Sequence, residues 1–344
     1  MSRDEHRPVT RLSTPIDFDA DGKQCDFIRL PHSVHRSAYG YLPIPLVCIK
    51  NGEGPTVLLM SGNHGDEYEG QVTLSKLCQT LEPSDIKGRV IILPMANYPA
   101  ALAGLRTSPI DQGNLNRSFP GDPHGTVTQQ IAFYIQSELM ERADYMLDLH
   151  SGGSSLNYVP SAILGGDLSS DSFAQRLEMA KAFGAPFTFI FPAGAPSGVA
   201  SESASARGTL AIGTEMAGSG TVSPAALRIC ERGVRNVLAH LGVMDGAQSD
   251  PPDTPTRLIR ASDMKFFSYA PEIGLFEPVV ELGDEVQAGQ LAGRVHTPET
   301  PWRAPHEVRF EADGFVVCKR IPGRVERGDC VFHLGADFDP ASLS

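Results

Sequence analysis

TVLLMS, residues 56–61, is a short apolar run that follows a Gly-Pro pair and ends at Gly62. A run of this length without alternating polar residues is typical of a strand buried on both faces of a parallel sheet. Apolar residues then recur at near-helical spacing over 68–81, and RVIILPM at 89–95 predicts the next strand. Together these segments predict a strand, helix, strand unit.

The same alternation continues along the chain. Apolar spacing predicts a helix over 126–142, and DYMLDL at 144–149 again resembles a strand. Residues 169–183 predict another helix, 209–216 another strand, and 223–242 a last helix that begins at a Ser-Pro pair. Alternating elements of this kind favour an α/β/α sandwich.

The composition changes at 244–255, MDGAQSDPPDTP, whose Pro, Asp, Gly and Ser residues are typical of a linker. We therefore expect a large α/β domain over 1–245 with an N-terminal β extension, a linker over 246–255, and a small all-β domain over 256–344. Two glycine-punctuated segments of the last part each contain a Gly-Asp pair before an apolar step, so a weak internal repeat is expected there.

Charge and cysteine usage narrow the classes of partner. The 344 residues carry a formal net charge of −12, and no run of Lys or Arg is long enough to follow a phosphate backbone or an anionic membrane. We expect neither nucleic acid nor a membrane as a partner. The six cysteines form no CxxC pair, and residues 1–12 lack the apolar core of a signal peptide, so we expect a soluble cytoplasmic protein with reduced thiols.

Polar residues follow the first strand in SGNHGDEYEG, residues 61–70. His64 and Glu67 lie three positions apart, so one turn of chain at the carboxyl end of a strand can direct an imidazole and a carboxylate to a common point. By itself the H-x-x-E pattern is weak, because such coincidences are common. A surface histidine, or one hydrogen-bonded in the core, is the alternative.

LDLHSGG, residues 147–153, places His150 at the end of another apolar strand. Parallel strands deliver their end residues to the same edge of the sheet, where open α/β sheets bind ligands. Two histidines and one carboxylate leave a fourth zinc position for water, as in hydrolytic sites. We therefore predict one zinc ion per chain, held by His64, Glu67 and His150. Asp148 either orients the His150 imidazole or is a buried structural carboxylate.

A hydrolytic zinc site also needs a base that accepts a proton from water and passes it to the departing amine. Glu215, in GTEMAGSG, ends a strand-like run among small residues that leave space for a substrate. We predict that Glu215 is this base, with an ordinary solvated glutamate as the alternative.

The loop RTSPIDQGNLNRSFPG, residues 106–121, carries two arginines. Arg117 offers a planar fork for a carboxylate, with Asn116 beside it, and Arg106 could stabilise a developing oxyanion. The alternative is a pair of solvated surface arginines.

These motifs together resemble the succinylglutamate desuccinylase and aspartoacylase family, relatives of the zinc carboxypeptidases, over nearly the whole chain. The resemblance implies a carboxypeptidase-like α/β/α fold with zinc on the His-Glu-His set. It also implies that Asn116 and Arg117 grip the substrate carboxylate, that Arg106 polarises the scissile carbonyl, and that Glu215 is the base.

Three blocks, NGEGPT from Asn51, NHGDEYEG from Asn63 and the 106–121 loop, more closely resemble the Nα-acetyl-L-2,4-diaminobutyrate deacetylases of ectoine breakdown within that family. This implies a small-molecule N-acyl amino acid as substrate. N-Succinylglutamate desuccinylase, aspartoacylase and metallocarboxypeptidase activities remain alternatives.

The C-terminal part resembles the barrel-sandwich hybrid folds of lipoyl and biotinyl carriers. It departs from them because no lysine occurs between Gly293 and Arg309, where the carrier lysine would lie. We therefore interpret this part as a lid or assembly domain. A homo-oligomer is compatible with it, and a non-enzymatic carrier or binding module is a second alternative for the chain.

Overall fold

The structure is a computed structural model. Some sequence expectations include residues that it does not describe, among them residues 1–8 of the segment expected to lack a signal peptide, Ser169, the expected first residue of a helix, and Asp253 in the expected linker. The structure describes residues 9–166, 168, 170–191, 198–252, 254–261 and 263–340.

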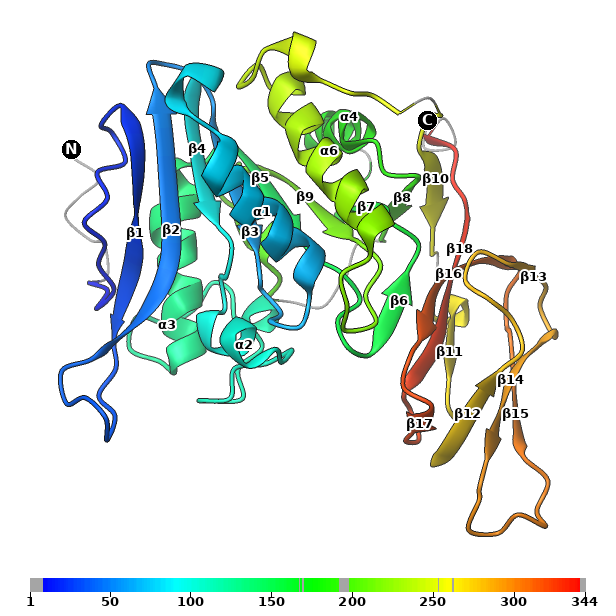
Figure 1. The fold of residues 1–344 in the computed structure, drawn as a ribbon. Coiled ribbons are helices and arrows are strands. Elements are labelled where there is room, and N and C mark those ends of the chain that lie inside the picture. The colour runs from blue at the N-terminus through cyan, green and yellow to red at the C-terminus, as the bar shows by residue number, and fades with distance from the viewer. Residues whose placement is uncertain are drawn as a thin grey trace.

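A large mixed β-sheet runs through the described part of the molecule (Figure 1). Its strands, in order across the sheet, are β1 (Gly22–Pro31), β2 (Tyr41–Asn51), β4 (Gly88–Leu93), β3 (Thr56–Ser61), β5 (Tyr145–Leu149), β9 (Leu210–Glu215), β7 (Ser161–Leu164), β8 (Phe187–Ile190), β10 (Arg257–Arg260), β18 (Cys330–Asp337), β16 (Gly314–Arg320) and β13 (Glu285–Val286). The neighbours β4, β3, β5 and β9 are mutually parallel, so the carboxyl ends of β3, β5 and β9 meet at one edge.

Helices cover both faces of this sheet. α1 (Tyr68–Thr80), α4 (Asp171–Phe183) and α6 (Pro224–His240) pack on one face, and α3 (Val127–Tyr134) and α5 (Ala200–Ser205) pack on the other. Strand β3 illustrates that both faces of the sheet are buried. Val57 and Leu59 join the first core, whereas the alternate residues Leu58 and Met60 join the second, and all four are fully buried.

Local signals explain where several elements begin and end. Ser223 caps α6 by accepting a hydrogen bond from the amide of Ala226, and Pro224 occupies the first helical position. Gly184 ends α4 in the left-handed region, with φ 71°. The predicted strands at 56–61, 89–95, 144–149 and 209–216 are confirmed to within a few residues, as are the helices after β3 and after Ser223.

The helix predicted over 126–142 is interrupted. It is α-helical only over Val127–Tyr134, continues as a π-helical turn over Ile135–Leu139, and ends in a 3-10 turn over Met140–Arg142. The wider turn keeps Ile135, Leu139 and Met140 in the same buried core. The shorter elements are α2 (Tyr98–Ala103) and 3-10 turns at Pro83–Asp85, Leu115–Arg117, Gly246–Gln248 and Met264–Phe266.

A small antiparallel sheet packs against the last strands of the large one and shares a third core with them (Figure 1). It consists of β15 (His306–Arg309), β14 (Leu291–His296), β12 (Gly274–Pro278) and β17 (Arg324–Val325). Two further short strands join the large sheet: β6 (Leu156–Tyr158) pairs with β16, and β11 (Phe267–Tyr269) pairs with β18. The predicted fold class, an α/β/α sandwich with a small C-terminal β part, is confirmed.

The two Gly-Asp pairs of the expected repeat lie in two turns of the same kind. Asp284 accepts a hydrogen bond from the amide of Glu281 at 2.8 Å, and Asp329 accepts one from the amide of Glu326 at 2.9 Å. The division at 246–255 stays a prediction, since β10 continues the large sheet in parallel with β8. Within the described residues, no helix is long and apolar enough to cross a membrane.

Candidate metal and active site

The loop after β3 brings His64 and Glu67 into the interior. Gly62 turns the chain with φ 67°, and a Cβ on Gly65 would lie 2.1 Å from the backbone of Ala100, so the loop can approach α2 only with glycine there. Glu67 is the N-cap residue of α1. Both side chains are almost fully buried, with exposed fractions of 4% for His64 and 3% for Glu67.

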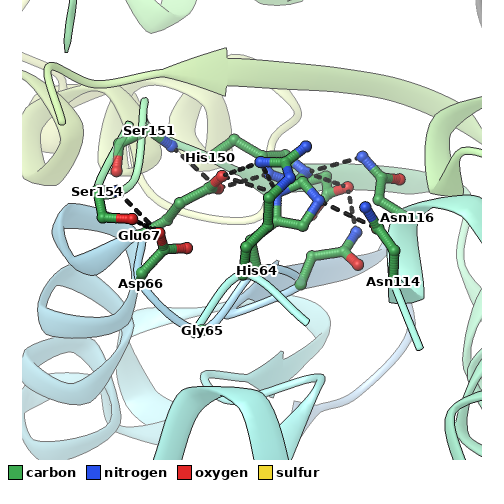
Figure 2. A network of polar contacts seen from close by, with 12 residues as sticks. His64, Gly65, Asp66, Glu67, Asn114, Asn116, His150, Ser151 and Ser154 are labelled. Atoms are coloured by element: carbon green, nitrogen blue, oxygen red, sulfur yellow. Dashed lines mark hydrogen bonds and ion pairs between the residues drawn. The ribbon is translucent and has the colours of Figure 1, made fainter. Parts of the chain in front are cut away.

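His150 follows β5 and reaches the same point. The Nδ1 atoms of His64 and His150 each lie 2.7 Å from a different carboxylate oxygen of Glu67 (Figure 2). One ligand atom from each residue lies within 4.8 Å of the other two. Two imidazoles and one carboxylate are a donor set suited to a zinc-type ion. This His-Glu-His group, as predicted, could hold a metal ion.

The charged forms of Glu67 and His150 stabilise each other. Burial acts to raise the pKa of Glu67, but the neighbouring imidazoles of His64 and His150 lower it below its usual range. Burial acts to lower the pKa of His150, but the carboxylates of Asp148 and Glu67 raise it well above its usual range. A bound cation would replace the shared protons as the positive partner of these carboxylates.

Polar side chains outside the group fix the two imidazoles. Asp148 Oδ2 lies 3.0 Å from His150 Nε2 and accepts a hydrogen bond from Asn63 at 3.1 Å, so Asp148 contacts the imidazole directly. Asn114 Oδ1 lies 3.2 Å from His64 Nε2. Sequence reasoning missed both asparagines. Asn63 precedes His64, and Asn114 lies two positions before Asn116, so adjacency to chosen residues was the available signal.

Glu215 ends β9, the parallel neighbour of β5, and so reaches the same edge of the sheet. The pairing of Asp148 with Gly213 places Glu215 just beyond the end of the shared ladder, and the next amide, that of Met216, donates to the carbonyl of His150. Burial, followed by the charge of Glu67, raises the pKa of Glu215 to about 8. Its Oε2 atom is buried and has no hydrogen-bond partner among the described residues.

Arg106 contacts the His-Glu-His group. Its Nη1 atom lies 3.6 Å from Glu67 Oε1 and 3.3 Å from His64 Nδ1, while its side chain is 47% exposed. A cation at this position faces both the group and the solvent, where a substrate would arrive.

Asn116 and Arg117 lie further out along the same loop. Asn116 Nδ2 is 3.4 Å from His150 Nε2, and Asn116 Oδ1 accepts a hydrogen bond from the amide of Ala200 at 2.8 Å. Arg117 is exposed, and its Nη1 donates to the carbonyl of Asn116 at 2.6 Å. Burial and the charge of Arg106 lower the pKa of Arg117. Arg117 thus feels the charge of Arg106 and lies one residue from Asn116, which contacts His150.

Three chain segments next to the site are joined by backbone hydrogen bonds. The amides of Gly152 and Tyr158 both donate to the carbonyl of Ala217, and the amide of Ser219 donates to the carbonyl of Leu156. The first segment follows His150, the second is β6, and the third follows Glu215. Because β6 pairs with β16, the C-terminal part of the chain also supports these three hydrogen-bonded segments.

The family described as succinylglutamate desuccinylase/aspartoacylase catalytic domain matches residues 53–241. That range contains the His-Glu-His group, Arg106, Asn116, Arg117 and Glu215. The chain belongs to this family. It is an enzyme of a family of deacylases, and the family predicted from the sequence is confirmed.

Similar proteins extend the likeness over almost the whole chain. An N-alpha-acetyl-L-2,4-diaminobutyric acid deacetylase of Halomonas elongata is 44% identical over 329 residues, 95% of each chain. The product-bound structure of the ectoine utilization protein EutE (DoeB) from Ruegeria pomeroyi is 40% identical, with TM-score 0.92 over 96% of this chain and 100% of that one. A succinylglutamate desuccinylase/aspartoacylase structure from Rhodobacter sphaeroides is 39% identical, with TM-score 0.91 over the same shares.

Proposed function

We propose that this family member is a zinc-dependent amidohydrolase that converts Nα-acetyl-L-2,4-diaminobutyrate to diaminobutyrate and acetate, as a step of ectoine breakdown. The observation that carries the proposal is the buried His-Glu-His group beside Glu215, in a chain 44% identical to the Halomonas elongata deacetylase. The likeness to EutE, described as an ectoine utilization protein, supports the same substrate.

His64, Glu67 and His150 are the proposed metal ligands, and zinc is the proposed metal, one ion per chain. The two nitrogen donors and one oxygen donor suit zinc, and all three are buried, whereas Arg106 beside them is 47% exposed and so marks the side from which a substrate would approach. A zinc ion there would act as a Lewis acid on the scissile carbonyl and would lower the pKa of water enough for attack near neutral pH.

Glu215 is the proposed base. Its position at the carboxyl end of β9 lets it accept a proton from the attacking water and return it to the leaving nitrogen. Burial raises the pKa of Glu215, and the positive charge of a bound metal ion would lower it again, toward the neutral range in which a base can both accept and return a proton. Arg106 is the proposed stabiliser of the oxyanion, because its guanidinium faces the His-Glu-His group.

Asn116 and Arg117 are the proposed clamp for the α-carboxylate of the substrate. Arg117 is exposed and has no carboxylate within 4.0 Å among the described residues; its Nη1 donates to the carbonyl of Asn116, which leaves the other guanidinium nitrogens for a carboxylate. We further propose that the enzyme is cytoplasmic, that 246–255 separates the catalytic domain from the C-terminal β part, and that this part acts as a lid or in assembly of a homo-oligomer.

The test combines metal analysis with kinetics on purified protein. We expect about one zinc per chain and a higher kcat/KM for Nα-acetyl-L-2,4-diaminobutyrate than for N-acetyl-aspartate, N-succinyl-glutamate or a dipeptide. A preference for either dianionic substrate would move the enzyme to the aspartoacylase or desuccinylase branch. Equal cleavage of dipeptides would support a metallocarboxypeptidase.

A further inference from the structure

The proposed substrate carries two charged groups that the enzyme must recognise. Its α-carboxylate is assigned to Arg117, whereas its side-chain ammonium lies about 5 Å from that carboxylate by covalent geometry and has no partner yet. A site built for an ammonium needs an acidic group at that distance, because an unpaired charge is costly to desolvate. The inference below rests on the proposed function and concerns this acidic group.

The segment that begins at Gly198 is docked onto the Arg117 loop. The amide of Ala200 donates to Asn116 Oδ1 at 2.8 Å, and the amide of Phe119 donates to the carbonyl of Gly198 at 3.3 Å. Gly198 has φ 83°, and a Cβ there would lie 2.6 Å from the carbonyl oxygen of Arg117. The start of α5 is therefore held directly against the proposed carboxylate clamp.

The orientation of α5 leaves one acidic side chain on the outer side. Ala200 and Ala204, one helical turn apart, are fully buried in the core, so Glu202 between them lies on the opposite side of the helix and is exposed. Its charge acts on the guanidinium of Arg117. No Lys, Arg or His of the described residues forms an ion pair with Glu202, so no direct salt bridge occupies its carboxylate.

The other carboxylates near the site are each hydrogen-bonded through at least one oxygen, and Asp66, Asp148 and Glu69 are also buried. Asp66 accepts from the amide and hydroxyl of Ser154, Asp148 from Asn63, and Glu69 from the amide of Ser223. On the Arg117 loop itself, Asp111 accepts from the amide and hydroxyl of Thr128. Glu67 belongs to the proposed metal group. Glu202, by contrast, is exposed, lies two residues after the amide that donates to Asn116, and forms no ion pair among the described residues.

We infer that Glu202 binds the side-chain ammonium of the substrate and thereby sets the preference for a diamino acid. The α-carboxylate on Arg117 and the ammonium on Glu202 would then pair with opposite charges on two segments that are hydrogen-bonded to each other. A second carboxylate, as in an acyl-aspartate or acyl-glutamate, would face Glu202 and be repelled.

The experiment compares two substrates that differ in one group, the terminal ammonium. Nα-Acetyl-L-2,4-diaminobutyrate carries the ammonium, whereas Nα-acetyl-L-2-aminobutyrate ends in a methyl group. Glu202→Gln should lower kcat/KM for the first substrate about tenfold, the scale of one charge-assisted hydrogen bond, and leave the second within about twofold. Glu178→Gln, an exposed glutamate on α4 paired with Lys181, is the matched control and should change neither.

Two further measurements distinguish recognition from support of the helix. Glu202→Lys should reverse the order, favouring N-acetyl-aspartate over the diaminobutyrate substrate. Calorimetric titration with the product, L-2,4-diaminobutyrate, should show binding about tenfold weaker to Glu202→Gln than to the wild type, with unchanged melting temperature.

Equal losses on both substrates, or an unchanged ratio in Glu202→Lys, would overturn the role of Glu202 while leaving the deacetylase proposal intact. A wild-type enzyme that does not cleave Nα-acetyl-diaminobutyrate would instead overturn the proposed function itself. The two failures therefore give different results.

Discussion

Glu67 Oε2 lies 2.7 Å from Nδ1 of His150, a residue 83 positions further along the chain. One carboxylate thereby joins the loop after β3 to the end of β5, and its other oxygen contacts His64 at the same distance. Since all three side chains are buried, removing Glu67 leaves His64 without its carboxylate partner, and removing either histidine leaves Glu67 with a single imidazole. Geometry and charge thus make the group a unit.

The first prediction follows from that unit. His64→Ala, Glu67→Ala and His150→Ala should each lose most of the bound zinc and nearly all activity, while the fold persists because the large sheet and its two cores do not depend on the metal. Metal analysis and circular dichroism on each variant provide the check. A variant with one zinc per chain and normal turnover would remove that residue from the ligand set.

The second prediction concerns the base. Glu215→Gln should retain zinc but lower kcat by about 10²-fold or more, the usual scale for a general base. The amide is close in size to the carboxylate it replaces, so binding should change little. If steady-state kinetics showed only a raised KM, Glu215 would be a substrate-binding group and another residue would have to accept the proton.

The third prediction separates the two arginines. Arg117→Ala should mainly raise KM, because a carboxylate clamp acts equally in the ground and transition states, whereas Arg106→Ala should mainly lower kcat. Arg106 contacts the His-Glu-His group and Arg117 does not, which is the structural basis for the difference. Identical changes in kcat and KM for the two variants would show that their roles cannot be divided in this way.

The sequence was sufficient to predict that His64, Glu67 and His150 meet at the sheet edge, because the topology alone brings these residues together. Apolar runs before His64 and before His150 predict parallel strands, and parallel strands end at a common edge. The runs also locate β3, β5 and β9 to within a residue or two. No contact between distant segments had to be known for this step.

Contacts between segments far apart in the chain explain the features that could not be predicted from the sequence. The pairing of β6 with β16 joins residues about 160 positions apart, and no periodicity in either segment predicts it. Asn114 reaches His64 because a 3-10 turn at Leu115–Arg117 orients the loop, a local geometry that its sequence does not specify. The π-helical turn after Tyr134 depends on packing against the second core. Sequence reasoning did not single out Glu202 for the same reason, since only the docking of α5 on the Arg117 loop brings Glu202 near the proposed substrate site.

The fourth prediction concerns the pH dependence of stability. His333 on β18 is 2% exposed, stacks on Phe267 at 3.9 Å between ring centroids, and has an Nε2 atom without a partner in the described structure. Burial lowers its pKa from 6.5 to about 3. The folded protein therefore holds His333 neutral, whereas the unfolded chain binds a proton below about pH 6.5. Stability from this residue is complete above pH 6.5 and is lost as pH falls toward 3.

Urea denaturation of the wild type and His333→Phe measures this effect. The difference in their free energies of unfolding should shift by about 2 kcal/mol against the wild type between pH 7.5 and pH 5. His240→Gln, which changes an exposed histidine at the end of α6, should show no such shift. A constant difference between wild type and His333→Phe across this range would mean that His333 can be protonated in the folded state.

The last prediction tests the three hydrogen-bonded segments next to the site. Gly218 has φ 142°, and a Cβ there would lie 2.2 Å from the carbonyl oxygen of Leu156 and 2.8 Å from Cα of Gly152. Gly218→Ala should therefore push β6 away from the segments that carry His150 and Glu215, lowering both melting temperature and kcat. Gly208→Ala is the control, because Gly208 also has a positive φ, 85°, but nothing within 4 Å of its Cβ position, so it carries backbone strain without the clash. If the two variants lost equal activity, strain alone would explain the effect, and the close packing of β6 would not contribute to the alignment of His150 with Glu215.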